Sequence, residues 1–76
     1  MKIEILGTGC PSCKKLEANV RAAVEKTGKK AEVVKITDIK EILSYGVMGT
    51  PALVINGKIV AQARIPSVDE IVKMLG

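Results

Sequence analysis

The sequence predicts an α/β fold with the element order β-α-β-α-β-β-α. Short apolar runs typical of buried strands alternate with segments in which apolar residues recur at helical spacing. A parallel connection between the first two strands and a hairpin between the last two then give a four-stranded mixed sheet flanked by three helices, with helices on both of its faces. At 76 residues the chain is expected to be a single domain, residues 1–76.

The first half of the chain is predicted to form a β-α-β unit. Residues 2–6 and 31–36 are apolar runs typical of strands, and apolar residues at helical spacing predict a helix over 11–27 between them. Pro11 suits the first turn of this helix, and Gly28 suits the position just past its end. The crossover between the two parallel strands is expected to be right-handed.

A short second helix is predicted between residues 38 and 45. Asp38 is the expected N-cap, and Gly46 is expected to end the helix. Its single apolar face consists of Ile39, Ile42 and Leu43. This helix lies between the second and third predicted strands.

The last third of the chain is predicted to be a hairpin followed by a helix. The apolar run 52–55 is typical of a buried central strand, and Asn56-Gly57 predicts a two-residue turn into a strand over 58–63. The segment Ser67-Val68-Asp69-Glu70 is a capping box, which marks the start of a helix. The buried stripe of this helix is expected to be Val68, Ile71, Val72 and Leu75.

The composition excludes several classes of protein. Hydrophobic residues make up 47% of the chain, which argues against disorder. No apolar run is long enough to span a membrane, and the N-terminal segment MKIEIL is too short for a secretory signal, so we expect a cytoplasmic protein. The net charge of +4 is spread over scattered basic residues, and Tyr45 is the sole aromatic residue, so we expect no nucleic-acid partner and a monomer.

Cys10 and Cys13, the two cysteines of the chain, allow three interpretations. A structural disulfide between them would close so small a loop that it would stabilise the fold very little. A closed zinc site needs four ligands, and the chain has no histidine and no other cysteine, whereas two thiolates suffice for Cu(I). The third interpretation is a redox pair.

The predicted helix makes the two cysteines unequal. Cys10 is at the N-cap, where unpaired N–H groups and the helix dipole favour a thiolate, and Lys14 and Lys15 add positive charge nearby. Cys13 shares the buried face of the helix with Leu16. We therefore expect an exposed Cys10 above a shielded Cys13, which suits attack followed by resolution better than chelation.

The start of the chain also resembles the heavy-metal-associated domains of copper chaperones. The resemblance lies in the first strand and in Cys10-Pro11-Ser12-Cys13. These domains usually carry Met two residues before the first cysteine, where this chain has Thr8, and they lack a helix between the second and third strands. A Cu(I)- or Zn(II)-binding metallochaperone-like domain is thus the alternative function.

Over nearly all of its length the chain resembles the thioredoxin superfamily in its small, glutaredoxin-sized form. The resemblance depends on Cys10-Pro11-Ser12-Cys13 after the first strand and on Thr50-Pro51 directly before the buried strand at 52–55. It implies the thioredoxin fold and a thiol–disulfide oxidoreductase with a redox-active Cys10–Cys13 disulfide. It implies no organic cofactor and no metal, and its partners are protein disulfides and an upstream reductase.

The resemblance also implies roles for individual residues. Cys10 attacks the substrate disulfide and Cys13 resolves the mixed disulfide, with Pro11 and Ser12 supporting them. Thr50-Pro51 is expected to be a cis peptide bond, which is accessible because X-Pro bonds have a small cis penalty. Glu4 lies six residues before Cys10, where many thioredoxins place a buried acid that accepts the proton of the second cysteine; the alternative is an exposed strand residue.

The chain departs from its relatives on both sides of the predicted site. Thioredoxins usually have Trp before the first cysteine, where this chain has Gly9. Glutaredoxins usually carry Gly-Gly after the hairpin, where this chain has residues 61–63, Ala-Gln-Ala. Asp69 and the Ser67 cap with its N–H groups are what remains for holding glutathione, and we expect no dedicated glutathione site.

Overall fold

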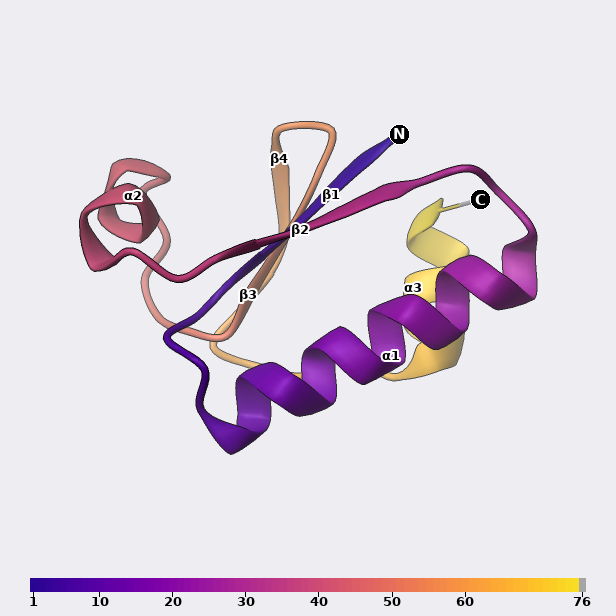
Figure 1. The fold of residues 1–76 in the computed structure, drawn as a ribbon, viewed down its shortest axis with the longest axis horizontal. Coiled ribbons are helices and arrows are strands. Elements are labelled where there is room, and N and C mark those ends of the chain that lie inside the picture. Colours follow the sequence, from indigo (N-terminus) through magenta and orange to yellow (C-terminus); the bar gives the residue numbers. More distant parts are fainter. Residues whose placement is uncertain (76) are drawn as a thin grey trace.

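The computed structural model describes residues 1–75 and places three helices and four strands in them (Figure 1). The predicted α/β element order is confirmed. Two predicted strands are each one residue shorter, and the second of these ends because Ala63 adopts a left-handed conformation with φ 53°. In chain order the elements are β1 (Lys2–Leu6), α1 (Pro11–Thr27), β2 (Glu32–Ile36), α2 (Ile39–Ser44), β3 (Ala52–Ile55), β4 (Lys58–Gln62) and α3 (Val68–Leu75).

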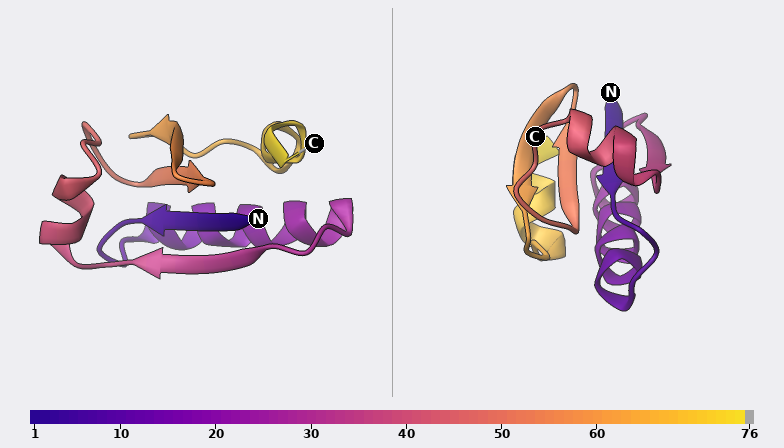
Figure 2. Two further views of the ribbon diagram at one scale, coloured as in Figure 1. Left: turned by 90° about the horizontal axis from the view of Figure 1, so that it is seen from above. Right: turned by 90° about the vertical axis from the view of Figure 1, so that its left-hand side faces the viewer.

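The four strands form one mixed sheet in the order β2-β1-β3-β4. β1 runs parallel to β2 and antiparallel to β3, with Leu6 opposite Ile36 on one side and opposite Ala52 on the other. The end of β1 therefore lies beside the end of β2 and the start of β3. Figure 2 shows that α1 begins and α2 lies at this same end of the sheet.

One face of the sheet is covered by α1 and α3. Their contact buries a core of ten residues, most of which are inaccessible to solvent. The core consists of Ile3, Ile5, Leu16, Val20, Ala23, Leu53, Ile55, Ala61, Ile71 and Leu75. Burying a side chain of this size stabilises the fold by roughly 1.5–3 kcal/mol, so this face is expected to supply most of the stability.

The other face is covered by α2, which is much shorter. Its core has four buried residues, namely Leu6, Ile42, Ala52 and Val54. Of the predicted apolar face of α2 only Ile42 is buried, because the side chains of Ile39 and Leu43 are 60% and 67% exposed.

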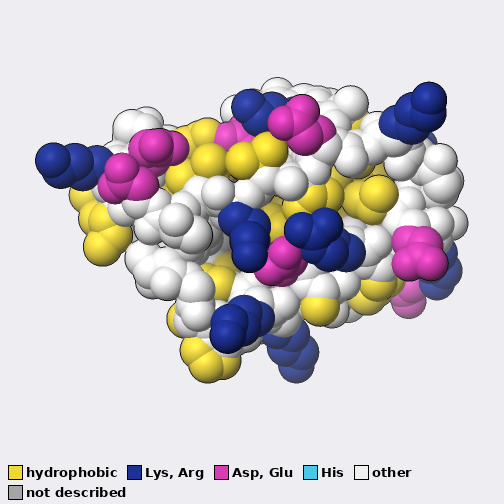
Figure 3. Space-filling model, in the orientation of Figure 1, with side chains coloured by type: hydrophobic (Ala, Val, Ile, Leu, Met, Phe, Trp, Pro, Cys, Tyr) yellow, Lys and Arg dark blue, Asp and Glu magenta, His cyan; other side chains and the backbone are white. Residues whose placement is uncertain are grey.

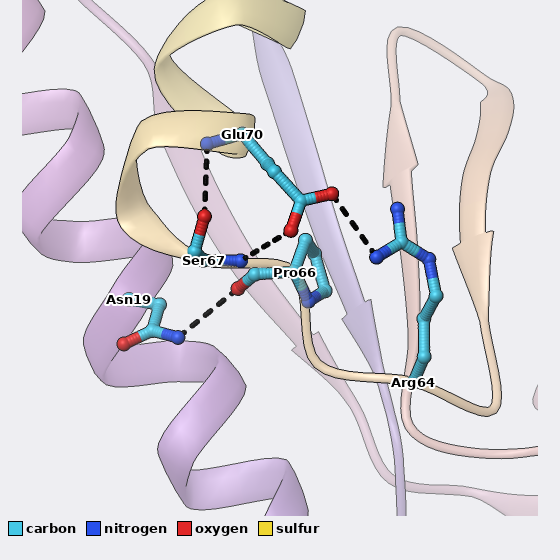
Figure 4. A network of polar contacts seen from close by, with 5 residues as sticks. All are labelled: Asn19, Arg64, Pro66, Ser67 and Glu70. Carbon is cyan, nitrogen blue, oxygen red and sulfur yellow. Dashed lines mark hydrogen bonds and ion pairs between the residues drawn. The ribbon is translucent and has the colours of Figure 1, made fainter.

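The predicted capping box at the start of α3 is confirmed, and it belongs to a larger polar network (Figure 4). The Glu70 N–H donates to Ser67 Oγ at 3.2 Å, and the Ser67 N–H donates to Glu70 Oε1 at 3.2 Å. Arg64 also donates to Glu70, and Asn19 on α1 donates to the Pro66 carbonyl at 3.0 Å. This network joins the beginning of α3 to the middle of α1.

The surface mixes charges of both signs. On the face shown in Figure 3, Lys and Arg side chains are interspersed with Asp and Glu side chains and form no continuous basic stripe. Among residues 1–75, no helix is long and apolar enough to cross a membrane.

Candidate active site

Cys10 occupies the N-cap of α1. Its backbone is extended, with φ −69° and ψ 164°, and Pro11 takes the first helical position. The Cys10 Sγ accepts a hydrogen bond from the Cys13 N–H at 3.3 Å. The hydrogen bonds from the Cys13 side chain and from the Cys13 N–H lower the pKa of the half-buried Cys10 thiol below its ordinary value. Cys10 is thus the cysteine that ionises first.

Cys13 lies one turn further along α1, on its buried face. Its side chain is 6% exposed, so the predicted difference in burial between the two cysteines is confirmed. Burial raises the pKa of the Cys13 thiol above its ordinary value, and the hydrogen bond with Cys10 adds to this effect. The pKa values of the two thiols are therefore shifted in opposite directions, that of Cys10 downward and that of Cys13 upward.

A small cavity lies beneath Cys13 and holds about 80 Å³. This is ample for water, which needs roughly 10–15 Å³ by the same measure. Its lining includes Gly7, Lys14, Glu17 and Lys35. Glu17 pairs with Lys35 at 3.5 Å and with Arg21 at 2.9 Å, and the Arg21 hydrogen bond lowers the pKa of Glu17. Cys13 is thus shielded from bulk solvent while lining a charged cavity.

Thr50-Pro51 is a cis peptide bond, as the resemblance implied. Because Ala52 pairs with Leu6, the buried Pro51 comes directly before the strand that lies beside the end of β1. The Ala63 N–H donates to the Pro51 carbonyl at 2.9 Å, which ties the end of β4 to this bond. The structure therefore brings Thr50-Pro51 to the same end of the sheet as the two cysteines.

Glu4 is buried, so the alternative of an exposed strand residue is wrong. Side chains alternate along a strand, which puts Glu4 on the α2 face together with Leu6, whereas Ile3 and Ile5 face α1. There the Tyr45 hydroxyl donates a hydrogen bond to the Glu4 carboxylate. Within residues 1–75 no hydrogen bond joins Glu4 to Cys13, and the proton-accepting role of Glu4 stays a prediction.

An open groove lies between Thr8, in the loop that joins β1 to α1, and α2. It holds about 310 Å³ and includes Thr8 and Thr50, one from each side of the predicted site. Three of its lining side chains are large, apolar and at least 60% exposed, namely Ile39, Leu43 and Met48. The sequence carried a signal for this surface, because Met48 and α2 directly precede Thr50-Pro51.

The two remaining candidates for a ligand site are already occupied by contacts within the protein. The Ser67 and Glu70 N–H groups are both used in the capping box, and Asp69 pairs with Lys26 on α1 at 3.3 Å. Within the described part of the chain, no three His, Cys, Asp or Glu side chains come together in a way that could hold a metal ion. The residues that could bind Cu(I) are the two cysteines.

A helix that begins between two cysteines of unequal burial, at the same end of the sheet as a cis-proline, defines a thioredoxin-like protein. The comparisons agree. The model of the thioredoxin domain family matches residues 1–76. The chain is 48% identical over 69 residues to a thioredoxin of Methanocaldococcus jannaschii, covering 91% of this chain and 79% of that one. It is 43% identical over 75 residues to a thioredoxin of Methanothermobacter thermautotrophicus, covering 99% and 97%. The chain belongs to the thioredoxin family of thiol–disulfide oxidoreductases.

Proposed function

We propose that this protein reduces disulfide bonds in other proteins through the dithiol Cys10-Pro11-Ser12-Cys13. Membership of the thioredoxin family supports thiol–disulfide exchange in general. The observation that carries the specific proposal is that the pKa values of the two thiols are shifted in opposite directions. The half-buried Cys10 ionises easily, whereas the buried Cys13 ionises with difficulty. Pro11 and Ser12 hold this arrangement by starting α1 between the two cysteines.

The reaction has two steps. The Cys10 thiolate attacks one sulfur of the substrate disulfide, forms a mixed disulfide and releases the other substrate sulfur as a thiolate. Cys13 then loses its proton and attacks the Cys10 sulfur, which breaks the mixed disulfide and releases the second substrate thiolate. The protein ends as the Cys10–Cys13 disulfide, and the substrate has gained two electrons.

The groove between Thr8 and α2 supports a protein substrate in preference to a small disulfide. Its exposed apolar side chains on α2 and at Met48 continue directly into Thr8 and Thr50. An extended segment of a substrate protein that carries the disulfide would lay apolar side chains in this groove and pair its backbone with Thr50.

The cycle needs a source of electrons, so an upstream reductase or a small dithiol must restore the Cys10–Cys13 pair. We propose that the protein acts as a monomer in the cytoplasm, where such disulfides are transient and catalytic. No organic cofactor enters either step, because the two cysteines carry both electrons.

The family resemblance implies that Glu4 accepts the proton that Cys13 loses in the second step. The burial of Glu4 supports this assignment, whereas its hydrogen bond from Tyr45 on the α2 face gives the carboxylate a different partner. The pH dependence of Cys13 reactivity in Glu4→Gln decides between them. An unchanged profile would remove Glu4 from the mechanism and leave it as a structural partner of Tyr45.

The proposal is tested with single-cysteine variants in the reduction of insulin by dithiothreitol. We expect Cys10→Ser to be inactive, and we expect reduced Cys13→Ser, freed of dithiothreitol before insulin is added, to accumulate a stable mixed disulfide that mass spectrometry detects. Turnover by Cys10→Ser together with loss of turnover in Cys13→Ser would reverse the two roles. If both variants retained turnover and the wild-type pair held one equivalent of Cu(I) tightly, the metallochaperone alternative would replace the proposal.

The order of ionisation predicts how the two thiols respond to pH. Alkylation of Cys10 by iodoacetamide should reach half its maximal rate at a lower pH than alkylation of an ordinary exposed thiol, because the Cys13 groups lower the pKa of Cys10. Alkylation of Cys13 in Cys10→Ser should require a higher pH, since burial opposes its ionisation. Equal profiles for the two cysteines would contradict the proposed asymmetry.

A further inference from the structure

Gly7 follows β1 and is buried directly behind the active site. Its N–H donates to the Ile36 carbonyl at 3.0 Å, which continues the pairing of β1 with β2 for one residue. Among residues 1–75, four other glycines have positive φ values, whereas Gly7 does not. Its backbone conformation is therefore open to any residue, and a turn does not explain why glycine stands here.

The side chain of Cys13 fills the space that a side chain at Gly7 would need. A Cβ atom added to Gly7 would approach Cys13 Sγ to less than 3.0 Å, a separation that real Cβ atoms essentially never show, and would lie 3.1 Å from Cys13 Cβ. The sulfur would have to move by roughly an ångström to restore an ordinary contact of 3.4–4 Å. Gly9, next to Cys10, has no atom within 4 Å of such a Cβ, so of the two glycines that flank Thr8 only Gly7 is crowded by Cys13.

We infer that Gly7 is a positioning residue for the second cysteine: its missing side chain provides the recess in which the Cys13 sulfur lies. The inference rests on the proposed function, in which Cys13 is the attacking sulfur of the second step. Gly7 and Cys13 also line the same cavity, so the recess is continuous with the space beneath the thiol. Gly7 thus sets the position of the Cys13 sulfur at the start of the second step.

The second step is the one that should depend on Gly7. In that step the Cys13 thiolate displaces the substrate sulfur from Cys10, and its success depends on the alignment of three sulfur atoms. A misplacement of the order of 1 Å costs about a hundredfold in rate in such reactions. The first step uses only Cys10 and the substrate, and it should be nearly insensitive to Gly7.

The reagent 5,5′-dithiobis(2-nitrobenzoate) separates the two steps in one stopped-flow experiment. The Cys10 thiolate releases the first thionitrobenzoate anion and becomes a mixed disulfide, and Cys13 then releases the second anion as the Cys10–Cys13 bond forms. In Gly7→Ala we expect the first phase to stay within about threefold of wild type and the second to be slower by about a hundredfold. A second phase at the wild-type rate would overturn the inference.

Gly28→Ala is the matched control. Unlike Gly7, Gly28 has a left-handed conformation that favours glycine, with φ 67°, and it lies at the far end of α1 with no atom within 4 Å of an added Cβ. We expect it to lower stability and to leave both phases of the reaction at wild-type rates. If Gly28→Ala slowed the second phase as much as Gly7→Ala, the effect would be a general loss of stability and the inference would fall.

A stability cycle tests the contact without any turnover. Gly7→Ala should raise the unfolding equilibrium constant of the reduced protein by about tenfold or more when Cys13 is present, because overpacking is destabilising. In the Cys13→Ala background most of this effect should disappear, since the sulfur is gone. Equal effects in both backgrounds would overturn the inference. If Gly7→Ala does not fold, folding of Gly7→Ala/Cys13→Ala supports the inference, and failure of this double variant to fold contradicts it.

These outcomes are distinct from failure of the proposed function. If Cys13→Ser resolved mixed disulfides normally, the proposed function would fail, whatever Gly7→Ala does. If Cys13→Ser trapped the mixed disulfide while Gly7→Ala resolved it at the wild-type rate, the proposed function would stand and the role of Gly7 would be wrong.

Discussion

The two faces of the sheet are built differently. The face under α1 and α3 buries ten core residues, whereas the face under α2 buries four and leaves apolar side chains of α2 in contact with solvent. The first face also carries the stabilising network at the start of α3. The difference indicates that the fold draws its stability from one face and leaves the surface proposed to contact the substrate on the other.

Removing a large side chain from each core gives the largest expected effect. Leu16→Ala on the α1 face should lower the free energy of unfolding by about 2–5 kcal/mol, because Leu16 is fully buried. Ile42→Ala on the α2 face should cost less than Leu16→Ala, since its small open core can collapse or admit water. Urea denaturation measures both, and an equal or greater loss in Ile42→Ala would remove the distinction between the faces.

The hydrogen bond from Tyr45 to Glu4 is the main polar contact of the α2 face. Tyr45→Phe leaves a buried carboxylate without this donor and should cost about 1–3 kcal/mol. In a Glu4→Gln background the hydrogen bond joins two uncharged groups, so the cost of Tyr45→Phe should fall to about 0.5–1.5 kcal/mol. Denaturant titrations of the four variants give the coupling, and an absence of coupling would mean that the two side chains contribute separately.

This contact also predicts a dependence on pH. The hydrogen bond with Glu4 raises the pKa of Tyr45, so the folded protein retains the hydroxyl proton to a higher pH than the unfolded chain does. The contribution of Tyr45 to the free energy of unfolding is then complete below about pH 10, which is the pKa of tyrosine in the unfolded chain. It is lost as the pH rises through the higher pKa of Tyr45 in the folded protein. The difference in stability between wild type and Tyr45→Phe should therefore shrink above pH 10.

The capping box gives a smaller effect on the stable face. Ser67→Ala removes the oxygen that accepts from the Glu70 N–H, and it should cost about 1 kcal/mol. Ser44 is a matched control, because its exposed hydroxyl bonds only to the Glu41 carbonyl within its own short helix. Ser44→Ala should change the free energy of unfolding by less than about 0.5 kcal/mol. Thermal unfolding measures both, and equal losses would show that the box adds nothing at Ser67.

The smallest effect on stability is expected on the exposed side of α2. Leu43→Ser should change the free energy of unfolding by less than about 0.5 kcal/mol, because the side chain is 67% exposed. It should nevertheless lower kcat/KM for insulin while leaving the reaction with a small aromatic disulfide unchanged. Lys40→Ser on the same helix is the control for both measurements. Unchanged kinetics with insulin in Leu43→Ser would exclude this groove as the substrate surface.

Local signals in the sequence were enough to predict most of the fold. Asn56-Gly57 forms the predicted turn with φ values of 52° and 83°, and Gly28 ends α1 in the left-handed conformation, because both signals act over a few residues. The N-cap position of Cys10 and the burial of Cys13 follow from the same local periodicity. These features could be predicted because they depend on neighbours in the chain.

The features that were missed depend on residues far apart in the sequence. Tyr45 meets Glu4 across 41 residues, and nothing in either segment signals the other. The helical spacing of Ile39, Ile42 and Leu43 predicted one apolar face, but it did not show that only Ile42 would be covered by the rest of the fold. Nothing in the sequence around Gly7 indicates that its missing side chain leaves the space in which the Cys13 sulfur lies.

The strand order β2-β1-β3-β4 has a consequence for the behaviour of the protein in concentrated solution. It leaves the outer edges of β2 and β4 without a partner strand within residues 1–75. Unpaired edges attract other chains, and lysine on an edge strand opposes such pairing. Lys35 on β2 and Lys58 on β4 are both exposed. With the net charge of +4, we expect them to oppose the edge-to-edge pairing of two copies into a continuous sheet.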